Sequence, residues 1–399
     1  MITYDEAFRR VMLYTNDFGE ETVSLLDSTN RVLAESIHAD RDFPPFDRST
    51  KDGIAINYAT FEKGINAFKI EGVLPAGIPQ QKLSDINNCF EIMTGAVLPA
   101  NTDTVVMYED IEIKDDIATI KSVSNEGQNI HFKGSDKKEG VTLLDKGTLI
   151  TAAEIGILAS VGKITVLVKK LPKICVISTG DELVPVSIKP LPHQIRTSNV
   201  ISLQAALLKE NIIADHLHIT DNKKVLEDRV SKAIDEYDIL LLSGGVSKGK
   251  FDFIPEVLED LGVEKIFHKV LQRPGKPFWF GVHEVSKTAV FSFPGNPVST
   301  FVNYHIYFKP WFKNSMGLFY SDKYVILENE IKIQSSLTLF LPVKIKWVEG
   351  KLLANKIENN GSGDLTCLTE ADGFICLTPK DLAYKEGALV PFFATKHTC

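Results

Sequence analysis

The sequence predicts a multi-domain α/β protein, with a central α/β domain that contains a parallel sheet, a small β-rich domain before it and a β-type module after it. From Lys173 to 293, apolar strands alternate with helical patterns, the order that gives right-handed crossovers and a parallel sheet. From Ile54 to about Gly140, short strand candidates follow one another closely, which favours a small β domain or barrel. From about residue 323, strand-type alternation returns.

The composition is that of a soluble globular protein. Its 399 residues are 44% hydrophobic and 24% charged, and its net charge of −8 argues against nucleic acid as the main partner. The five cysteines include no CxxC pair, so we expect neither a zinc site nor a disulfide framework, and a reducing compartment fits. The amino terminus lacks a basic-then-apolar signal, and no apolar run approaches about 18 residues. We therefore expect a cytoplasmic protein that does not contact a membrane.

Several elements can be predicted from local signals. Thr3 can cap a helix over residues 3–14 with Glu6 in capping-box position, and Thr151 and Glu154 repeat this signature for a helix over 151–161. In the α/β region we expect strands at 174–178, 216–219, 239–242 and 289–293, and helices at 198–211, 223–236 and 254–261.

The stretch ILLLSGGVSKGKFD at 239–252 carries the clearest binding signal. A buried apolar strand breaks there into a turn of glycine, hydroxyl and charge. Glycines let backbone N–H groups approach an anion without interference from a Cβ atom. The turn is either a phosphate site or an ordinary strand-to-helix connection. Its candidate residues are Ser243, Gly244, Gly245, Ser247, Lys248 and Asp252.

Two other predicted strands of the α/β region also end in polar turns that contain glycine. These turns are STGDE at 178–182 and PGNPVS at 294–299. Because ligands bind at the carboxyl ends of parallel strands, we expect the three turns to converge on one edge of the sheet. The candidates in these two turns are Ser178, Thr179, Gly180, Glu182, Pro294, Gly295, Asn296 and Ser299.

The β-rich region adds a second group of candidates. The loop DFPPFDRSTKDG at 42–53 holds more charge than a connector needs, including Asp52. Thr94 and Asp136 stand in two further polar turns, MTG and FKGSD. These loops either bind a ligand or are simply solvated, as charged loops usually are.

The distribution of side chains narrows the chemistry. The sequence contains no Walker A, HExxH, GxSxG or GxGxxG motif, which removes the commonest phosphate, zinc-protease and hydrolase interpretations. Acids, cations and hydroxyls in turns suit instead a phosphorylated or oxyanionic substrate neutralised by Mg²⁺. The acids are Asp52, Asp136, Glu182 and Asp252, the cations of the turn QRPGKP are Arg273 and Lys276, and the hydroxyls are those of Ser247 and Ser299.

Seven motifs, in order, carry a resemblance to a known family. They are PPFDRSTKDGIA, IMTGAVLP, STGDEL, SGGVSKGKFD, RPGKPFWFG, FPGNPVS and NNGSGDLTCLTEADGFICL. Over nearly its whole length the chain resembles the molybdopterin molybdenumtransferases, the MoeA family, which also supplies the C-terminal domain of gephyrin. The resemblance implies that adenylylated molybdopterin and molybdate react, with Mg²⁺ as cofactor, to give molybdenum cofactor and AMP.

The resemblance also implies a domain organisation and partners. The central domain becomes a molybdopterin-binding domain, and the subunits form an elongated homodimer whose site is completed by the partner's 47–53 loop and strands of 54–140. Molybdopterin adenylyltransferase and acceptor molybdoenzymes are implied as protein partners. The expected domains are an extended linking domain (1–20, 37–45 and 141–171), a β-rich domain (21–36 and 46–140), the α/β domain (172–320) and a C-terminal β-barrel-like domain (321–399).

Residue roles carry over from the motifs position by position. The acids Asp52, Asp136, Glu182 and Asp252 are expected to be catalytic, and Asp52, Glu182 and Asp252 to hold the metal. Molybdate is expected to bind Ser247, Arg273, Lys276, Ser299, Lys344 and Thr366. The pterin substrate is expected to contact Thr94, Ser178, Thr179, Gly180, Ser243, Gly244, Gly245, Lys276, Pro294, Gly295 and Asn296.

The chain departs from the family pattern at a few positions. Lys51 replaces a methionine, Ile54 a tyrosine and Arg273 the first lysine of KPGKP. Arginine keeps the charge and adds forked donors, so anion binding should survive with altered geometry. Two other functions remain open at this point: a non-catalytic dimeric scaffold of the gephyrin type, and a nucleotidyl-transfer enzyme that acts on molybdopterin.

Overall fold

The chain divides into two compact units. The computed structural model describes residues 1–246, 252–321, 323–379 and 383–396. Unit 1 comprises Met1–Ala34, Leu149–Thr151 and Thr165–Cys399, and unit 2 comprises Glu35–Thr148 and Ala152–Ile164. The finer division into four domains stays a prediction.

Unit 1 is built on a six-stranded sheet with the order β16-β13-β17-β21-β20-β18. Strands β16, β13, β17 and β21 are parallel, as the alternation with helices predicted. Strand β20, which was not among the predicted strands, pairs antiparallel with both β18 and β21, so the complete sheet is mixed. Connections without a helix lead into and out of β20, and such connections cannot make the crossover that a parallel strand needs. The strands are β13 (Ile174–Thr179), β16 (Asp215–Ile219), β17 (Ile239–Ser243), β18 (Val263–His268), β20 (Trp279–His283) and β21 (Ala289–Phe293).

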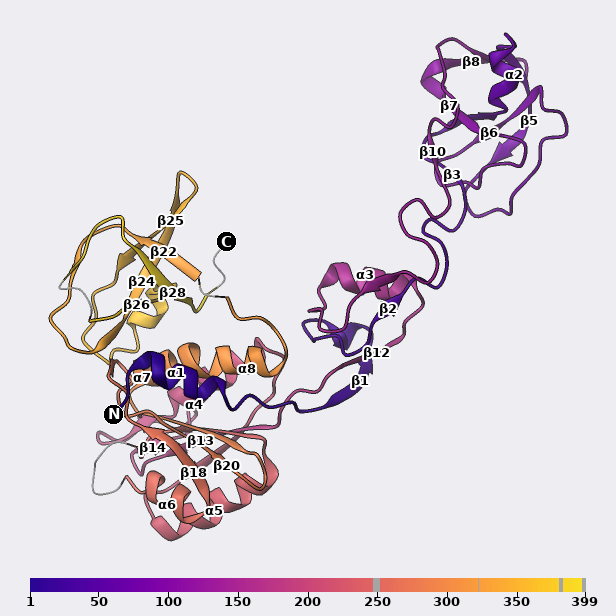
Figure 1. Cartoon of the computed structure of the whole chain (residues 1–399). Helices are drawn as coiled ribbons and strands as arrows, with labels where there is room; N and C mark the ends of the chain where they lie inside the picture. The colour runs from indigo at the N-terminus through magenta and orange to yellow at the C-terminus, as the bar shows by residue number, and fades with distance from the viewer. Residues whose placement is uncertain (247–251, 322, 380–382, 397–399) are drawn as a thin grey trace. The chain divides into compact units, whose positions relative to one another are not determined.

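Helices cover both faces of this sheet (Figure 1). In β17, Leu240 and Leu242 pack into one apolar core with α5 and α6, whereas Ile239 and Leu241 pack into another with α4 and the helices after β21. The continuous apolar run of β17 therefore fills two cores at once. The helices named here are α4 (Ser198–Leu208), α5 (Lys223–Glu236) and α6 (Ile254–Asp260).

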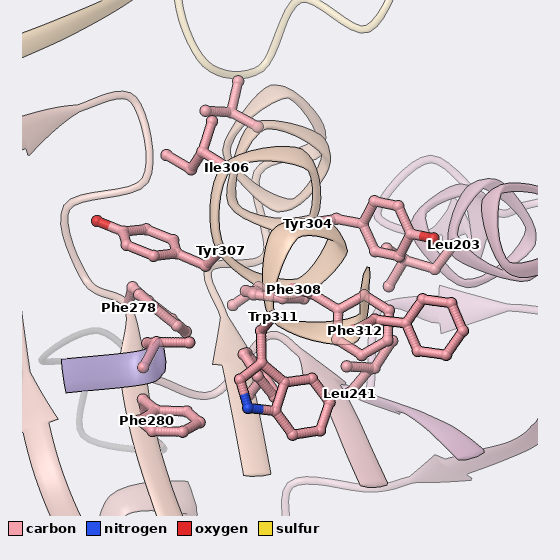
Figure 2. Close-up of a cluster of buried hydrophobic side chains, with 14 of the residues drawn as sticks. Leu203, Leu241, Phe278, Phe280, Tyr304, Ile306, Tyr307, Phe308, Trp311 and Phe312 are labelled. Carbon is pink, nitrogen blue, oxygen red and sulfur yellow. The ribbon is translucent and has the colours of Figure 1, made fainter. Parts of the chain in front are cut away.

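A continuous helical stretch after β21 was not predicted from the sequence. It consists of α7 (Pro297–Asn303), the π-helical segment η3 (Tyr304–Phe308) and α8 (Lys309–Ser315). All five residues of η3 are buried, and Figure 2 shows Tyr304 pointing toward Leu203 of α4 and Tyr307 lying beside Phe278. A helix buried on all sides has no amphipathic period, and the aromatic run YHIYF by itself favours a strand.

The carboxyl-terminal part of unit 1 is a small β-barrel. Strands β24, β25, β22, β28 and β26 pair in sequence, and β26 pairs back to β24 to close the ring. Strand β19 (Gln272–Arg273) adds to β24, so the RPGK turn begins beside the barrel. The barrel strands are β22 (Lys323–Leu327), β24 (Thr338–Val348), β25 (Lys351–Lys356), β26 (Gly373–Leu377) and β28 (Leu389–Ala394).

The remaining elements of unit 1 are short. Helix α1 begins where predicted, because the Thr3 hydroxyl accepts a hydrogen bond from the Glu6 N–H at 3.3 Å. These elements are α1 (Tyr4–Met12), β1 (Glu20–Ser24), η1 (Leu26–Ser28), β12 (Thr165–Lys169), β14 (Leu183–Val184), β15 (Ile195–Arg196), β23 (Ile331–Lys332), α9 (Cys367–Glu370) and β27 (Ala383–Tyr384).

Unit 2 contains its own six-stranded sheet, with the order β7-β4-β6-β5-β9-β8. Strand β4 lies between β6 and β7, and a Cβ atom at Gly53 would overlap the Val106 carbonyl oxygen. Only glycine fits this position, directly after Asp52. The elements are β2 (Ile37–His38), β3 (Arg48–Ser49), β4 (Gly53–Ile56), α2 (Tyr58–Glu62), β5 (Ala67–Leu74), β6 (Asn88–Ile92), β7 (Thr104–Met107), η2 (Tyr108–Asp110), β8 (Ile111–Lys114), β9 (Ile117–Ile120), β10 (Ile130–His131), β11 (Thr142–Leu144) and α3 (Ala152–Ser160).

Within the described ranges, no helix has the length and apolar character needed to cross a lipid bilayer.

Candidate active site

The three strand-end turns of the α/β region come together, as predicted. The side-chain amide of Asn199 donates to the Ser243 hydroxyl at 2.9 Å and to the Gly295 carbonyl at 2.7 Å. The Thr300 hydroxyl donates to the Pro294 carbonyl at 2.5 Å and lies 3.4 Å from the Ser243 hydroxyl. Asn199 was not among the predicted residues, although its place in the polar run TSN at the start of α4 is a signal that could have found it.

Glycine is required where the SGGVS turn lies against Thr179 of the STGDE turn. Gly244 and Gly245 have φ angles of +107° and +62°, in the region that favours glycine. A Cβ atom on either residue would lie within 3.0 Å of the Thr179 side-chain oxygen. That hydroxyl is buried and has no hydrogen-bond partner among the described groups. An unsatisfied buried donor next to two open backbone turns is the kind of group that a ligand can satisfy.

Ser178 occupies a different environment from its neighbour. Its hydroxyl lies 3.2 Å from His216 Nε2 and 3.1 Å from His218 Nδ1, on the adjacent edge strand β16. Burial, and then the nearby His218, lower the pKa of His216. Ser178 is only 1% exposed, so its contacts are with this histidine pair, and its predicted role in substrate binding stays a prediction.

Carboxylates crowd the carboxyl end of β13. The backbone N–H of Asp221 donates to Asp181 Oδ1 at 3.1 Å. Burial raises the pKa of Asp221, and the negative charges of Asp181, Glu182 and Asp252 raise it further. Glu182 and Asp252, both predicted from the sequence, therefore act on the same group. The negative charges at this end of the strand therefore disfavour ionisation of Asp221.

The RPGK turn opens onto a cavity of about 730 Å³ between the α/β domain and the barrel. Arg273, Lys276 and Ser299 line it, together with the PGN turn. Lys332 and Lys356 also line it and were not predicted, because isolated lysines in a β module carry no motif. Lys356 pairs with Glu358 at 2.8 Å. Among the described residues, no carboxylate pairs with the other three cations.

A buried amide network supports the RPGK turn. Gln272 is fully buried, and its Nε2 donates to the Pro274 carbonyl at 3.0 Å and to Asn303 Oδ1 at 2.9 Å. The Tyr307 hydroxyl donates to Gln272 Oε1 at 2.5 Å. Asn303 Nδ2 in turn donates to the Gly275 carbonyl at 3.3 Å. Because both amides are almost fully satisfied, the turn is held rigidly and its two cations project from a fixed base.

Two of the predicted molybdate-binding residues, Lys344 and Thr366, do not join this group, and a third cannot be placed. Lys344 pairs with Asp372 at 3.4 Å, and the Thr366 hydroxyl donates to Asp364 Oδ1 at 2.5 Å. Neither of them lines the cavity. Ser247 lies outside the described residues. The roles predicted for these three stay predictions.

In unit 2, the predicted acid Asp52 and Thr94 are direct partners. Asp52 Oδ1 accepts hydrogen bonds from the Thr94 N–H at 2.6 Å and the Thr94 hydroxyl at 2.7 Å. These two bonds lower the pKa of Asp52, since they stabilise the charged carboxylate. The acid is therefore ionised, and one of its oxygens is fixed in place.

The second acid of unit 2 is held by a residue that the sequence did not single out. Asp136 Oδ1 lies 2.8 Å from His131 Nε2, and Arg48 Nη2 lies 3.2 Å from His131 Nδ1. Arginine only donates, so Nδ1 accepts and the Nε2–H is left to donate to Asp136. His131 thus orients the carboxylate. A lone histidine directly before the FKGSD turn is a weak signal, but it was available in the sequence.

The acids of unit 1 fit a magnesium ion by their chemistry. Mg²⁺ prefers oxygen ligands and is usually bound by one or two carboxylates together with substrate phosphates. Glu182 and Asp252 supply such oxygens in a carboxylate-rich surrounding. In the part of the chain that the structure describes, no three His, Cys, Asp or Glu side chains form a group that could hold a metal ion by themselves.

Comparisons with known proteins decide the family. The N-terminal region of MoeA (domains I and II) matches residues 2–162, a probable molybdopterin-binding domain matches 175–314, and the C-terminal region of MoeA (domain IV) matches 324–394. The molybdopterin molybdenumtransferase of Synechocystis is 39% identical over 99% of this chain and 100% of its own length. The chain belongs to the molybdopterin molybdenumtransferase (MoeA) family of enzymes.

Other MoeA relatives agree with this assignment. The molybdopterin molybdenumtransferase of Bacillus subtilis is 32% identical over 98% of this chain and 93% of its own length. The crystal structure of a molybdopterin biosynthesis MoeA protein from Pyrococcus horikosii is similar over the whole of both chains, with 30% identity and a TM-score of 0.82. The resemblance inferred from the seven motifs is therefore confirmed.

Proposed function

We propose that this protein inserts molybdenum into adenylylated molybdopterin, using molybdate and Mg²⁺ and releasing AMP, to form molybdenum cofactor. The observation that carries the proposal is the 730 Å³ cavity, which is lined by Arg273, Lys276 and Ser299. Molybdate is a tetrahedral dianion, and such an ion needs several donors from different directions. Molybdate and the pterin are the substrates in this proposal.

The cationic turn is suited to binding molybdate before it reacts. Arg273 offers a planar fork of N–H donors and Lys276 a compact charge, so the two can contact different oxygens. The amide network of Gln272 and Asn303 fixes the turn, which limits the reorganisation needed when the anion enters. Buried Ser299, near the start of α7, also lines the cavity and carries a hydroxyl that can donate.

The converging strand-end turns are suited to the phosphate-bearing part of the pterin substrate. The open backbone at Gly244 and Gly245 and the unsatisfied Thr179 hydroxyl supply neutral donors beside the acids. We propose that Glu182 and Asp252 hold Mg²⁺ there. When bound, the ion would neutralise the phosphoanhydride oxygens and favour departure of AMP.

The activity can be tested directly. We expect the purified chain, given adenylylated molybdopterin, molybdate and Mg²⁺, to release AMP in step with molybdenum cofactor formation. In Lys276→Ala, the molybdate concentration for half-maximal rate should rise about tenfold or more, because a charge-assisted bond is lost, with little change in pterin affinity. Lys224→Ala, which removes an exposed lysine on α5, is the control. If pterin affinity collapses while the molybdate dependence stays unchanged, Lys276 binds the pterin phosphate instead.

We further propose that the active form is a homodimer that uses acids from both units of the chain. The support is that Asp52 and Asp136 belong to unit 2, whereas Glu182 and Asp252 belong to unit 1. Asp52→Ala and Asp252→Ala subunits, each inactive alone, should recover about a quarter of the wild-type rate when mixed one to one, because half of the dimers then contain one intact site. Absence of recovery after verified subunit exchange would contradict a shared site.

A further inference from the structure

Unit 1 has a second cavity that none of the predicted site residues lines. Its volume is about 530 Å³, and it lies among the end of α4, the helical stretch η3–α8 and the barrel strands β22 and β28. It shares no lining residue with the 730 Å³ cavity. It is therefore a separate feature of the molecule.

The walls of the second cavity are strongly basic. Among the described residues that line it, five are lysines and one is a glutamate. Glu210 is nearly buried, with 9% of its side chain exposed, and it pairs with Lys313 and, at 3.6 Å, with Lys309. One carboxylate is therefore shared by two cations. The lining lysines are Lys209, Lys309, Lys313, Lys323 and Lys396.

Two of these lysines are available to a ligand. Lys209, which follows α4, and Lys323, which starts β22, pair with no carboxylate among the described residues. Lys396 differs, because it pairs with Asp372 at 3.8 Å and donates to the Thr369 carbonyl at 2.6 Å. The cavity thus holds more positive charge than its own carboxylate balances.

His305 adds an unsatisfied polar group to the cavity wall. The residue lies in η3, is 6% exposed, and neither ring nitrogen has a hydrogen-bond partner among the described groups. Burial, and then the charges of Lys309 and Lys209, lower its pKa to about 3, so the ring is neutral near pH 7. A neutral imidazole has one N–H donor and one acceptor. Buried polar groups in proteins are nearly always paired, so a partner for this ring is missing.

We propose that the second cavity is an anion site that binds a phosphate group. The lining lysines come from the end of α4, from α8, from the start of β22 and from the segment after β28, so a tetrahedral oxyanion could receive donors from several directions. A dianion fits better than a single carboxylate, because Lys209 and Lys323 remain unpaired and Glu210 satisfies only part of the charge of Lys309 and Lys313. This site is independent of the proposed molybdate site.

The first experiment measures phosphate binding to the second cavity in a variant whose 730 Å³ cavity has lost the Lys276 charge. The full-length Lys276→Gln chain is titrated with inorganic phosphate by calorimetry in chloride buffer. Adding Lys209→Gln and Lys323→Gln together should weaken phosphate binding at least about tenfold, since two charge-assisted bonds are lost. Adding Lys224→Gln instead, a matched loss of charge on exposed α5, should leave the affinity unchanged. Equal affinities in the triple variant and its control would overturn the proposal.

The second experiment separates free phosphate from a phosphate ester. The same titration with adenosine monophosphate should give equal affinity if only the phosphate group is bound, and tighter binding if the cavity also accepts the nucleoside. Either result supports a phosphate site. Failure of both ligands to bind would overturn it.

His305→Phe tests the unsatisfied imidazole. The substitution removes two unpaired polar atoms and keeps a planar ring beside Phe301, so the ligand-free variant should melt at or above the wild-type temperature. It should also show a smaller rise in melting temperature with added phosphate than the wild type does. An unchanged rise would exclude His305 from the site.

Discussion

The two cavities of unit 1 are both basic, but the chain builds them differently. In the larger cavity, Arg273 and Lys276 stand on a turn made of proline and glycine, fixed from below by buried amides. In the smaller cavity, the lysines stand mainly on helix and strand ends, and a nearly buried carboxylate, Glu210, holds two of them. In the larger cavity, the rigid turn fixes where the cations lie. In the smaller cavity, the chain gathers several positive charges without fixing each one in place.

This difference suggests different uses. Fixed donors suit a reaction, because the binding groups need not reorganise as charge moves. A cluster of flexible lysines suits retention of an anion, because several charges attract it without dictating one geometry. We therefore expect substitutions at the larger cavity and its neighbouring acids to change the reaction rate, and substitutions at the smaller one to leave it unchanged.

The largest expected effect is that of Asp252→Ala. If this carboxylate holds Mg²⁺ next to the converging turns, its loss should lower kcat on the order of 100-fold or more, measured as AMP release. The unfolding midpoint should change little, because the side chain is only half-buried. Lys209→Gln, at the smaller cavity, is the matched variant and should keep the wild-type kcat. Near-normal AMP release by Asp252→Ala would contradict the assignment.

The second effect is on stability. Gln272→Leu should lower the free energy of unfolding by about 2 kcal/mol, because the Tyr307 hydroxyl and the Asn303 amide lose a buried partner. Urea denaturation measures this change. The Gln272→Leu substitution should also weaken molybdate binding, because the turn that carries Arg273 and Lys276 loses its hydrogen-bonded support.

Gln334→Leu provides the control for Gln272→Leu. Gln334 lines the same cavity but is exposed and donates to no described group, so this substitution should stay within about 0.5 kcal/mol of wild type. Equal stability of the two variants would show that the amide network does not support the turn.

The sequence predicted the turns better than it predicted what lies beneath them. Glycine, proline and charge mark STGDE, SGGVS and PGNPVS directly. In the structure, Asn199 joins the last two turns, and Thr179 of STGDE lies against Gly244 and Gly245. Glycine has a local steric cause at Gly244 and Gly245, where a side chain would meet Thr179. Local steric requirements of this kind depend on single residues, so they can be recognised from the sequence before the fold is known.

The parts that sequence analysis missed depend on distant partners. Gln272, Asn303 and Tyr307 form one network across 35 residues, and nothing local in any of them indicates the other two. The helix at 297–315 was missed because its residues are buried on nearly every side, which removes the amphipathic period. Strand β20 runs antiparallel because the connections before and after it contain no helix and cannot form a parallel crossover. The QRPGKP motif in the first of these connections does not indicate this direction.

The third prediction concerns the pH dependence of the free energy of unfolding. It tests a single residue of the smaller cavity, His305. The pKa of His305 is about 3 in the folded chain and ordinarily 6.5. Below pH 6.5 the unfolded chain binds a proton that the folded chain does not, so stability falls as pH falls. The fall should approach about 1.4 kcal/mol per pH unit between pH 6 and 4.

His305→Phe should remove this contribution and leave the rest of the pH profile. Carboxylates with lowered pKa values, such as Asp52 and Asp364, also lose stability in acid, but they are common to both proteins. The measurement is therefore the difference between two urea-unfolding series in phosphate-free buffer. Parallel profiles would mean that His305 is not kept neutral by burial.

The smallest expected effect is at Lys344, where the barrel could still contribute to molybdate binding. This lysine has 62% of its side chain exposed, pairs with Asp372 at 3.4 Å, and does not line the larger cavity. Exposed ion pairs contribute about 0 to 1 kcal/mol, so Lys344→Gln should be nearly as stable as wild type. Its half-maximal molybdate concentration should stay within about twofold, whereas Lys332→Gln, which removes a cation from the cavity wall, should raise it more. A larger effect at Lys344 than at Lys332 would mean that the barrel rearranges when molybdate binds, and that the cationic turn does not bind the anion alone.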